Sequence, residues 1–258
     1  MLASGSKGNC SVVEDPTTNT FIVVDCGISW KAFRERSLDQ GIDLSRIAAI
    51  LITHEHSDHT KGLGVTTRGL AKLGVTPSLY ASSLVHAASS EIRAIENAVD
   101  LRHFNQGDEM HFGNTTVYAF RTSHDAAESF GFRFTQGNDT LGFMTDTGVA
   151  TPESIEALAN CRILAIEANH DADMLAHGPY PAYLKSRIAS AQGHLSNEQS
   201  AQLLDSLLCD KLETVVGMHV SQNNNTYRYP KDVLGETLAR NCHSASALVG
   251  YQDRPISL

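Results

Sequence analysis

The sequence predicts an α/β fold in which two β-sheets pack face to face and are covered by helices. Strand-like and helix-like segments alternate in both halves of the 258-residue chain, and the middle, from Leu101 to Asp146, is rich in strands. No linker or low-complexity stretch divides the chain. Because 41% of its residues are hydrophobic, the chain can bury one large core. We therefore expect a single domain over residues 1–258.

The N-terminal segments predict a hairpin followed by a helix. Two strand-like runs, Cys10 to Glu14 and Thr20 to Asp25, are separated by a turn that contains proline. Ser29 is a suitable N-cap for the helix that follows. The apolar members of this helix fall at helical spacing, and they are Trp30, Phe33 and Leu38.

A buried strand, a pair of helices and a strand-rich region come next. The apolar run from Ile47 to Thr53 predicts the strand, and helical patterns cover Lys61 to Leu73 and Ser82 to Ala98. Glycine-asparagine turns then separate strands of alternating polarity. These four strands are expected at Glu109 to Phe112, Thr115 to Thr122, Phe130 to Thr135 and Thr140 to Thr145.

The last third of the chain again alternates helices and strands. Pro152 begins a helix with favourable N-terminal chemistry, and Arg162 to Glu167 predicts another buried strand. Leu195 to Leu208 is expected to be helical, with Ser196 as its cap. A further helix should separate the two final strands, which are expected at Thr214 to Val220 and Ala245 to Val249.

One loop carries four metal-ligating residue types within six positions. His54, His56, Asp58 and His59 follow directly after the buried strand, and imidazole and carboxylate groups are ligands of divalent zinc, manganese or iron. Residues two apart on extended backbone project to the same side, so His54 and His56 can bind one ion. Asp58 and His59, past a turn, can then reach a second ion. The sequence therefore predicts a metal site.

This His-x-His-x-Asp-His pattern resembles the signature of the metallo-β-lactamase superfamily of binuclear metallohydrolases. The resemblance covers nearly the whole chain and implies the four-layer αββα sandwich and two divalent metal ions. It also implies three further ligands, each after another predicted strand: His124 on the first ion, Asp146 as a bridge, and His219 on the second ion. The superfamily includes classical lactamases, which commonly lack the bridging carboxylate, and flavodiiron oxidoreductases, which usually have glutamate at the place of His56. Hydrolysis is therefore favoured over redox chemistry.

The same resemblance implies a mechanism. Two ions lower the pKa of a shared water, so that hydroxide forms near neutral pH, and Asp58 would orient it and accept its proton. His194 is the candidate acid for the leaving group, because the segments around Glu167 and His194 resemble the late motifs of ribonuclease Z-type phosphodiesterases. Glu167 would orient His194. A role of His194 in capping a helix or supporting a ligand remains an alternative.

Five further motifs resemble a small bacterial branch of the superfamily called YycJ or WalJ. The branch is associated with metal-dependent nuclease activity, including 5′ to 3′ exonuclease action on DNA, so a role in DNA repair is expected. Lys7 departs from the branch, where a small polar residue is usual. The motifs are Ser4 to Cys10, Glu167 to Asp171, Gly178 to Pro181, Gly193 to Glu198 and His219 to Asn224.

Two other functions remain open. The formal net charge of −9 argues against an extended basic groove, although two divalent ions would bring about +4 to the site itself. A thioester or lactone hydrolase, similar to glyoxalase II, shares the same centre and fits the acidic charge better. A non-catalytic metal-binding partner in a signalling or repair complex is the third class. The choice among zinc, manganese and iron, and the oligomeric state, stay undetermined.

The sequence also predicts a cytoplasmic protein with no membrane partner. No apolar stretch approaches the roughly 20 residues that span a bilayer, and no signal-peptide pattern is present. The cysteines are odd in number and form no Cys-x-x-Cys pair, which favours reduced thiols. They are Cys10, Cys26, Cys161, Cys209 and Cys242.

Overall fold

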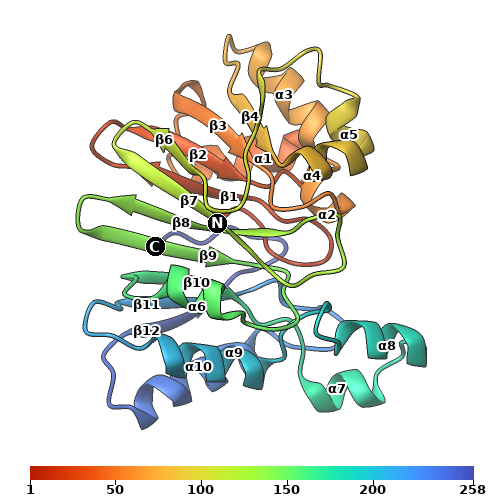
Figure 1. Ribbon diagram of the computed structural model, residues 1–258, viewed down its shortest axis with the longest axis vertical. Coiled ribbons are helices and arrows are strands. Elements are labelled where there is room, and N and C mark those ends of the chain that lie inside the picture. Colours follow the sequence, from red (N-terminus) through yellow and green to blue (C-terminus); the bar gives the residue numbers. More distant parts are fainter.

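The structure is a computed structural model that describes all 258 residues, and it contains two β-sheets with helices on both outer faces (Figure 1). This confirms the predicted αββα sandwich. The first sheet has its strands in chain order: β1 (Ser11–Asp15), β2 (Thr20–Val24), β3 (Ile47–Leu51), β4 (Ser78–Ala81) and β5 (Leu101–His103). β1 and β2 form the expected antiparallel hairpin, and the later pairs are parallel.

The second sheet contains the remaining strands. They are β6 (Glu109–Phe112), β7 (Thr115–Arg121), β8 (Phe130–Gln136), β9 (Asp139–Met144), β10 (Ile163–Glu167), β11 (Thr214–Met218) and β12 (Ser246–Val249). Their spatial order is β12-β11-β10-β9-β8-β7-β6. The pairs from β6 to β9 are antiparallel, and those from β9 to β12 are parallel. β7 and β9 therefore run in the same direction as β10 and β11.

Helices cover the outside of each sheet. On the first sheet these are α1 (Trp30–Asp39), α3 (Leu63–Ala71), α4 (Ser83–Ala88) and α5 (Ser90–Arg93). A short 3₁₀ turn at Leu44–Arg46 lies between α1 and β3. On the second sheet they are α6 (Pro152–Leu158), α9 (Asn197–Leu207) and α10 (Arg228–Arg240). Ser29 caps α1, and Ser196 forms a reciprocal capping box at the start of α9, both as predicted.

The hydrophobic core has three layers. A central cluster lies between the sheets and joins residues such as Val24 and Leu51 of the first sheet to Phe132 and Val216 of the second. Two outer clusters lie between each sheet and its helices. Apolar side chains on the inner face of each sheet thus bind the two sheets together, which fixes how their ends meet.

One predicted helix is wrong. Instead of a single helix over residues 82–98, the chain forms α4 and α5, separated at Ser89. Ser89 adopts extended backbone angles, and its Oγ accepts a hydrogen bond from the backbone N–H of Ile92, so it caps the second helix rather than continuing the first. Leu38 also differs from its expected burial, since it is 53% exposed.

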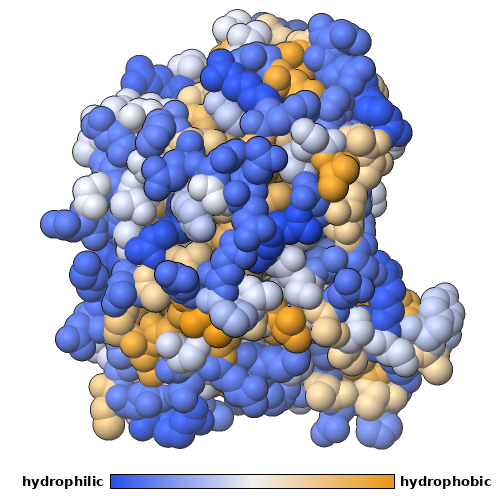
Figure 2. Space-filling model, viewed as in Figure 1, coloured by the Kyte–Doolittle hydropathy of each residue, from blue (hydrophilic) through white to orange (hydrophobic).

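Three short helices lie at one edge of the sandwich. α2 (Ser57–Thr60) follows β3, and α7 (Ala172–His177) and α8 (Ala182–Ile188) belong to the long connection after β10. Figure 1 shows α7 and α8 projecting at the lower right, and the space-filling view in Figure 2 has a protrusion at the same place. None of the helices is long and apolar enough to cross a membrane.

Candidate metal centre

The predicted ligands come from one edge of the sandwich. The loop with His54 and His56 follows β3, while His124, Asp146 and His219 follow β7, β9 and β11. In the second sheet these three strands run in the same direction, so their carboxyl ends meet at one edge. The topology therefore gathers side chains that are up to 165 residues apart in the sequence, from His54 to His219.

Three acidic or imidazole residues at this edge have left-handed backbone. Asp25, Asp146 and His219 have φ angles of 61°, 48° and 54°. This conformation costs roughly 1–2 kcal/mol for a residue that carries a Cβ atom. Each lies just after a strand, where the turn redirects its side chain toward the centre. Such backbone is concentrated at functional sites.

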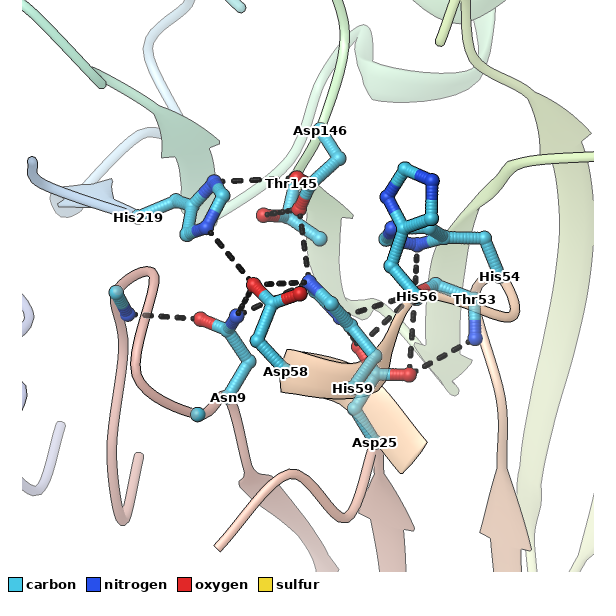
Figure 3. A network of polar contacts seen from close by, with 12 residues as sticks. Asn9, Asp25, Thr53, His54, His56, Asp58, His59, Thr145, Asp146 and His219 are labelled. Atoms are coloured by element: carbon cyan, nitrogen blue, oxygen red, sulfur yellow. Dashed lines mark hydrogen bonds and ion pairs between the residues drawn. The ribbon is translucent and has the colours of Figure 1, made fainter. Parts of the chain in front are cut away.

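The ligand-type atoms form overlapping groups. We call His54, His56 and His124 the first group, and Asp58, His59 and His219 the second group; Figure 3 shows the second group with Asp146 beside it. Asp146 joins the two, since it lies with His54 and His59, and a fourth group contains Asp146, Glu167, His194 and His219. Within each group, atoms that could hold a metal ion lie within 4.8 Å of one another. The structure therefore brings together every residue that the sequence predicts as a ligand or catalytic group.

The donor atoms fit a divalent metal. His124 Nε2 and His56 Nδ1 lie 3.3 Å apart, and two nitrogen ligands of one tetrahedral zinc ion lie about 3.3 Å apart. The buried atom His54 Nε2 has no hydrogen-bond partner, and His219 Nε2 forms no hydrogen bond although Asp58 Oδ2 lies 3.4 Å from it. A buried polar atom without a partner costs about 1–3 kcal/mol, and a bound cation removes that cost. The residues present thus suit a metal in both groups.

Charge differs between the two groups. Burial lowers the pKa values of His54 and His124, which keeps these imidazoles neutral and their lone pairs available. In the second group, burial alone would lower the pKa of His219, but Asp146, Asp58 and Glu167 raise it to about 10. The carboxylates thus stabilise positive charge at this position, whether it is a proton or a metal ion.

Each of four histidines has one ring nitrogen held by the protein. The partner fixes the ring orientation and leaves the other nitrogen facing the centre. The Nδ1 contacts are His54 with Thr53 Oγ1 at 2.9 Å, His59 with Asp25 Oδ2 at 2.7 Å, His124 with the Gly193 carbonyl at 2.9 Å, and His219 with Glu167 Oε1 at 2.9 Å.

His194 and Glu167 adjoin the ligand groups. His194 Nδ1 lies 2.7 Å from Glu167 Oε1, and the His194 side chain is 18% exposed, whereas Glu167 is fully buried. Burial would raise the pKa of Glu167, but His194 and His219 lower it to about 2. An ionised Glu167 therefore faces His194 at neutral pH and can accept a hydrogen bond from its Nδ1–H. Glu167 Oε2 also accepts hydrogen bonds from the backbone of Thr147 and Leu195.

Sequence reasoning missed two residues of this centre, Asp25 and Asn9. Asp25 Oδ1 accepts hydrogen bonds from the backbone and hydroxyl of Thr53, while Oδ2 holds His59. Asn9 Nδ2 lies 3.2 Å from Asp58 Oδ2. One signal was available for Asp25, because it follows a strand that pairs in parallel with β3 and so ends at the same edge as His54.

The sequence of the chain matches a known protein family and two named nucleases. Residues 20–220 match the family model described as the beta-lactamase superfamily domain. Exodeoxyribonuclease YycJ of Bacillus anthracis is 35% identical over 225 residues, which are 87% of this chain and 83% of that protein. Exodeoxyribonuclease WalJ of Streptococcus pneumoniae serotype 2 is 34% identical over 227 residues, 87% of this chain and 82% of that protein.

Solved structures have the same fold at lower identity. The metallo-beta-lactamase fold protein YhfI from Bacillus subtilis superposes with a TM-score of 0.68 and 15% identity, over 97% of this chain and 94% of that chain. At this identity the similarity concerns the arrangement of the elements alone. It agrees with the two sheets and covering helices described above.

Proposed function

The chain belongs to the beta-lactamase superfamily, within the family of YycJ and WalJ, and from that premise we propose that it is a metal-dependent phosphodiesterase that degrades DNA from its 5′ end. Two divalent ions, zinc or manganese, would be held by the first and second groups, with Asp146 between them. We expect the protein to act in the cytoplasm, where free thiols such as those of its five cysteines persist.

The bound ions would supply the electrophilic chemistry, by lowering the pKa of a water molecule and offsetting the charge of the phosphate. Asp58 would orient the attacking water. Burial alone raises the pKa of the Asp58 carboxyl, but His59 and His219 hold it well below its usual range. Asp58 therefore stays ionised and acts as a hydrogen-bond acceptor over the whole neutral range.

His194 would protonate the leaving oxygen. Glu167 fixes the His194 ring through Nδ1, which leaves Nε2 as the atom that can donate a proton to the substrate. The partial exposure of His194 allows a substrate to reach it, while the buried Glu167 cannot be reached. Asp146 Oδ1 lies 3.6 Å from His194 Nδ1, so the proton donor adjoins the proposed bridging carboxylate.

The pair of His194 and Glu167 is the observation that favours a phosphodiester over a thioester substrate. A sugar alkoxide is a poor leaving group and needs a proton, whereas a thiol with a pKa of about 8.5 can leave as the thiolate. A held proton donor beside the centre is therefore needed for the first reaction and is of little use in the second. This supports the nuclease over a thioester hydrolase, whereas a lactone, whose leaving group is also an alkoxide, is distinguished by the substrate test below.

Digestion of end-labelled DNA tests the proposal. Single- and double-stranded DNA with a 5′-phosphate would be incubated with protein loaded with Zn²⁺ or Mn²⁺. The controls are Asp58→Ala and wild-type protein from which a chelator has removed the metal. We expect progressive shortening from the 5′ end that disappears in Asp58→Ala and after removal of metal. Shortening from the 3′ end would correct the polarity alone.

The same preparations would be tested on a thioester and a lactone. The contrary result is that the protein binds two ions, leaves both DNA forms intact and hydrolyses the thioester or the lactone at enzymatic rates. That result would replace the nuclease proposal with the thioester or lactone hydrolase. Full DNA cleavage by folded Asp58→Ala would contradict the role of Asp58.

A further inference from the structure

A turn near the N-terminus, buried except at Ser6 and Lys7, touches the second group from two sides. The turn, Ser4 to Asn9, precedes β1, and Ser4 Oγ accepts a hydrogen bond of 2.7 Å from the backbone N–H of His219. On the other side, the backbone N–H of Asn9 donates to the Asp58 carbonyl at 2.7 Å. The turn thus bridges two of the residues that would hold the second ion.

The Asn9 side chain points at the same group (Figure 3). Its Oδ1 accepts a hydrogen bond of 2.8 Å from the backbone N–H of Gly5, which fixes the amide orientation, because only the oxygen can accept. Nδ2 then lies 3.2 Å from Asp58 Oδ2 and 3.0 Å from His59 Nε2. The carboxylate of Asp58 has several lone pairs and can accept from Asn9 while it binds an ion, whereas His59 Nε2 has one lone pair, so only the contact with Asp58 can persist in the metal-bound site. Asn9 is only 7% exposed.

Asn9 is the one side chain outside the second group that contacts the Asp58 carboxylate. This carboxylate contacts three side chains, those of Asn9, His59 and His219, and the two histidines are themselves proposed ligands. His59 has Asp25 on its Nδ1, and His219 has Glu167, but Asp58 has Asn9 alone outside the group. Without Asn9, no side chain beyond the ligands would orient this carboxylate.

Hydrogen bonds from Gln252 and close backbone packing hold the turn in place against Asp58. Gln252, near the end of the chain, accepts from the backbone N–H of Lys7 at 2.8 Å and donates to the Gly8 carbonyl at 2.9 Å. Gly8 has a φ of 143°, and a Cβ atom there would lie 2.3 Å from the Gly27 carbonyl oxygen. A Cβ atom on Gly27 would lie 1.6 Å from the Asp58 carbonyl oxygen. Backbone therefore packs on backbone from the turn to Asp58.

We propose that Asn9 is a positioning residue that orients Asp58 and thereby sets the affinity of the second group for a divalent ion, while the first group is independent of it. The proposal rests on the two-ion site of the proposed function. None of the contacts of Asn9 involves His54, His56 or His124. Loss of a hydrogen-bond partner behind a metal ligand typically lowers metal affinity by 10–100-fold.

Metal titration of the apoprotein tests this without any substrate. Wild type, Asn9→Ala and the control Asn138→Ala would be titrated with Zn²⁺ against a competing chelating dye, and the two binding steps resolved. Asn138 is exposed in the turn between β8 and β9, away from the centre. We expect one step of Asn9→Ala to weaken by 10–100-fold, with the other step and both steps of the control unchanged.

Each other outcome has its own meaning. Two unchanged steps in folded Asn9→Ala would overturn the proposal, and so would equal weakening of both steps, since that indicates a general loss of structure. Binding of fewer than two ions by the wild type would instead contradict the two-ion site of the proposed function.

A second variant covers the case in which Asn9→Ala does not fold. Gln252→Ala loosens the turn, yet Gln252 makes hydrogen bonds to the turn and to Arg36 and Tyr227, and to none of the proposed ligands. We expect selective weakening of the same single step, by a smaller factor. Wild-type affinity at both steps in this variant would contradict the proposal.

Discussion

Single residues of the metal centre differ in which part of the chain holds them. His124 is held by the Gly193 carbonyl, whereas His219 and His194 share one oxygen, Oε1 of Glu167. A change at Glu167 would therefore disturb a proposed ligand and the proposed proton donor together. A change at His194 would disturb the proton donor alone, which makes it the cleaner test of chemistry.

His194→Ala should lose activity according to the leaving group. On DNA we expect a decrease in kcat of about 10²–10⁴-fold, the usual contribution of a general acid. On bis(4-nitrophenyl) phosphate, whose phenolate leaves without a proton, the decrease should be less than about 10-fold. Steady-state rates on both substrates at equal metal content measure the difference. His177→Ala, on the exposed end of α7, is the matched control, and equal losses on the two substrates would rule out the acid role.

The sequence could predict the residues that lie in one short motif or follow a strand. Four of the proposed ligands lie within six positions, and the others each follow a strand whose pattern is clear. Asp25 and Asn9 could not be assigned a role, because their meaning depends on contacts with His59 and Asp58 some 34 and 49 residues away. Such contacts exist only once the first sheet has formed.

Among the elements, α1 and α3 pack closely against each other on the outside of the first sheet. Gly69 of α3 faces the indole ring of Trp30 at the start of α1, and a Cβ atom there would lie 2.4 Å from ring carbons. Gly64 of the same helix faces the flexible end of Arg68 at 3.4 Å. A side chain therefore does not fit at Gly69 unless the indole ring moves, whereas one fits at Gly64.

Alanine at these two positions should change stability in opposite directions. Gly69→Ala should decrease the free energy of unfolding by about 1–3 kcal/mol, because the rigid indole ring must move. Gly64→Ala should increase it by about 0.4–1 kcal/mol, through higher helix propensity and a less flexible unfolded chain. Urea unfolding followed by circular dichroism measures both. A destabilised Gly64→Ala, or an unaffected Gly69→Ala, would show that the packing of α1 on α3 adjusts more easily than described.

Elements with strong periodicity, a clear cap or an adjoining turn signal were predicted, and several short elements without one were not. The hairpin of β1 and β2, α1 and α9 follow from alternation or from capping serines. β4 has only four residues and β5 only three, and neither adjoins a glycine-asparagine turn like the one that follows the equally short β6. α8 has no buried residue, so no apolar stripe marks it.

Across the whole molecule, Asp15 joins the two sheets at the edge strands. Asp15 ends β1 and is fully buried, and its Oδ2 accepts a hydrogen bond of 2.6 Å from the backbone N–H of Asn114, in the turn between β6 and β7. Its Oδ1 accepts from Thr17 at 2.9 Å and from Gln136 Nε2 of β8 at 3.2 Å. Burial would raise the pKa of this carboxyl, but these hydrogen bonds hold it well below the usual value.

Asp15→Ala should destabilise the fold in a pH-dependent way. At pH 7 the loss should be about 2 kcal/mol or more, because buried donors lose a charged acceptor. Since the pKa of Asp15 is lowered on folding, its contribution is present above the unfolded pKa of about 3.9 and is lost as the pH falls through the folded pKa. Urea unfolding of wild type and variant from pH 7 to pH 2.5 should show a constant difference above about pH 5 that shrinks below pH 4. A difference independent of pH would mean that the charge of Asp15 is not involved.

The contact between Gln252 and the N-terminal turn also has a consequence for biosynthesis. The turn is synthesised well before Gln252, which follows Lys7 by 245 positions. At a translation rate of about 5–20 residues per second, the turn waits roughly 12–50 s for that partner. His219, the other partner of the turn, also arrives late. A nascent chain therefore contains His54, His56 and His124 before it contains His219, so the residues of the first group are all synthesised before the second group is complete.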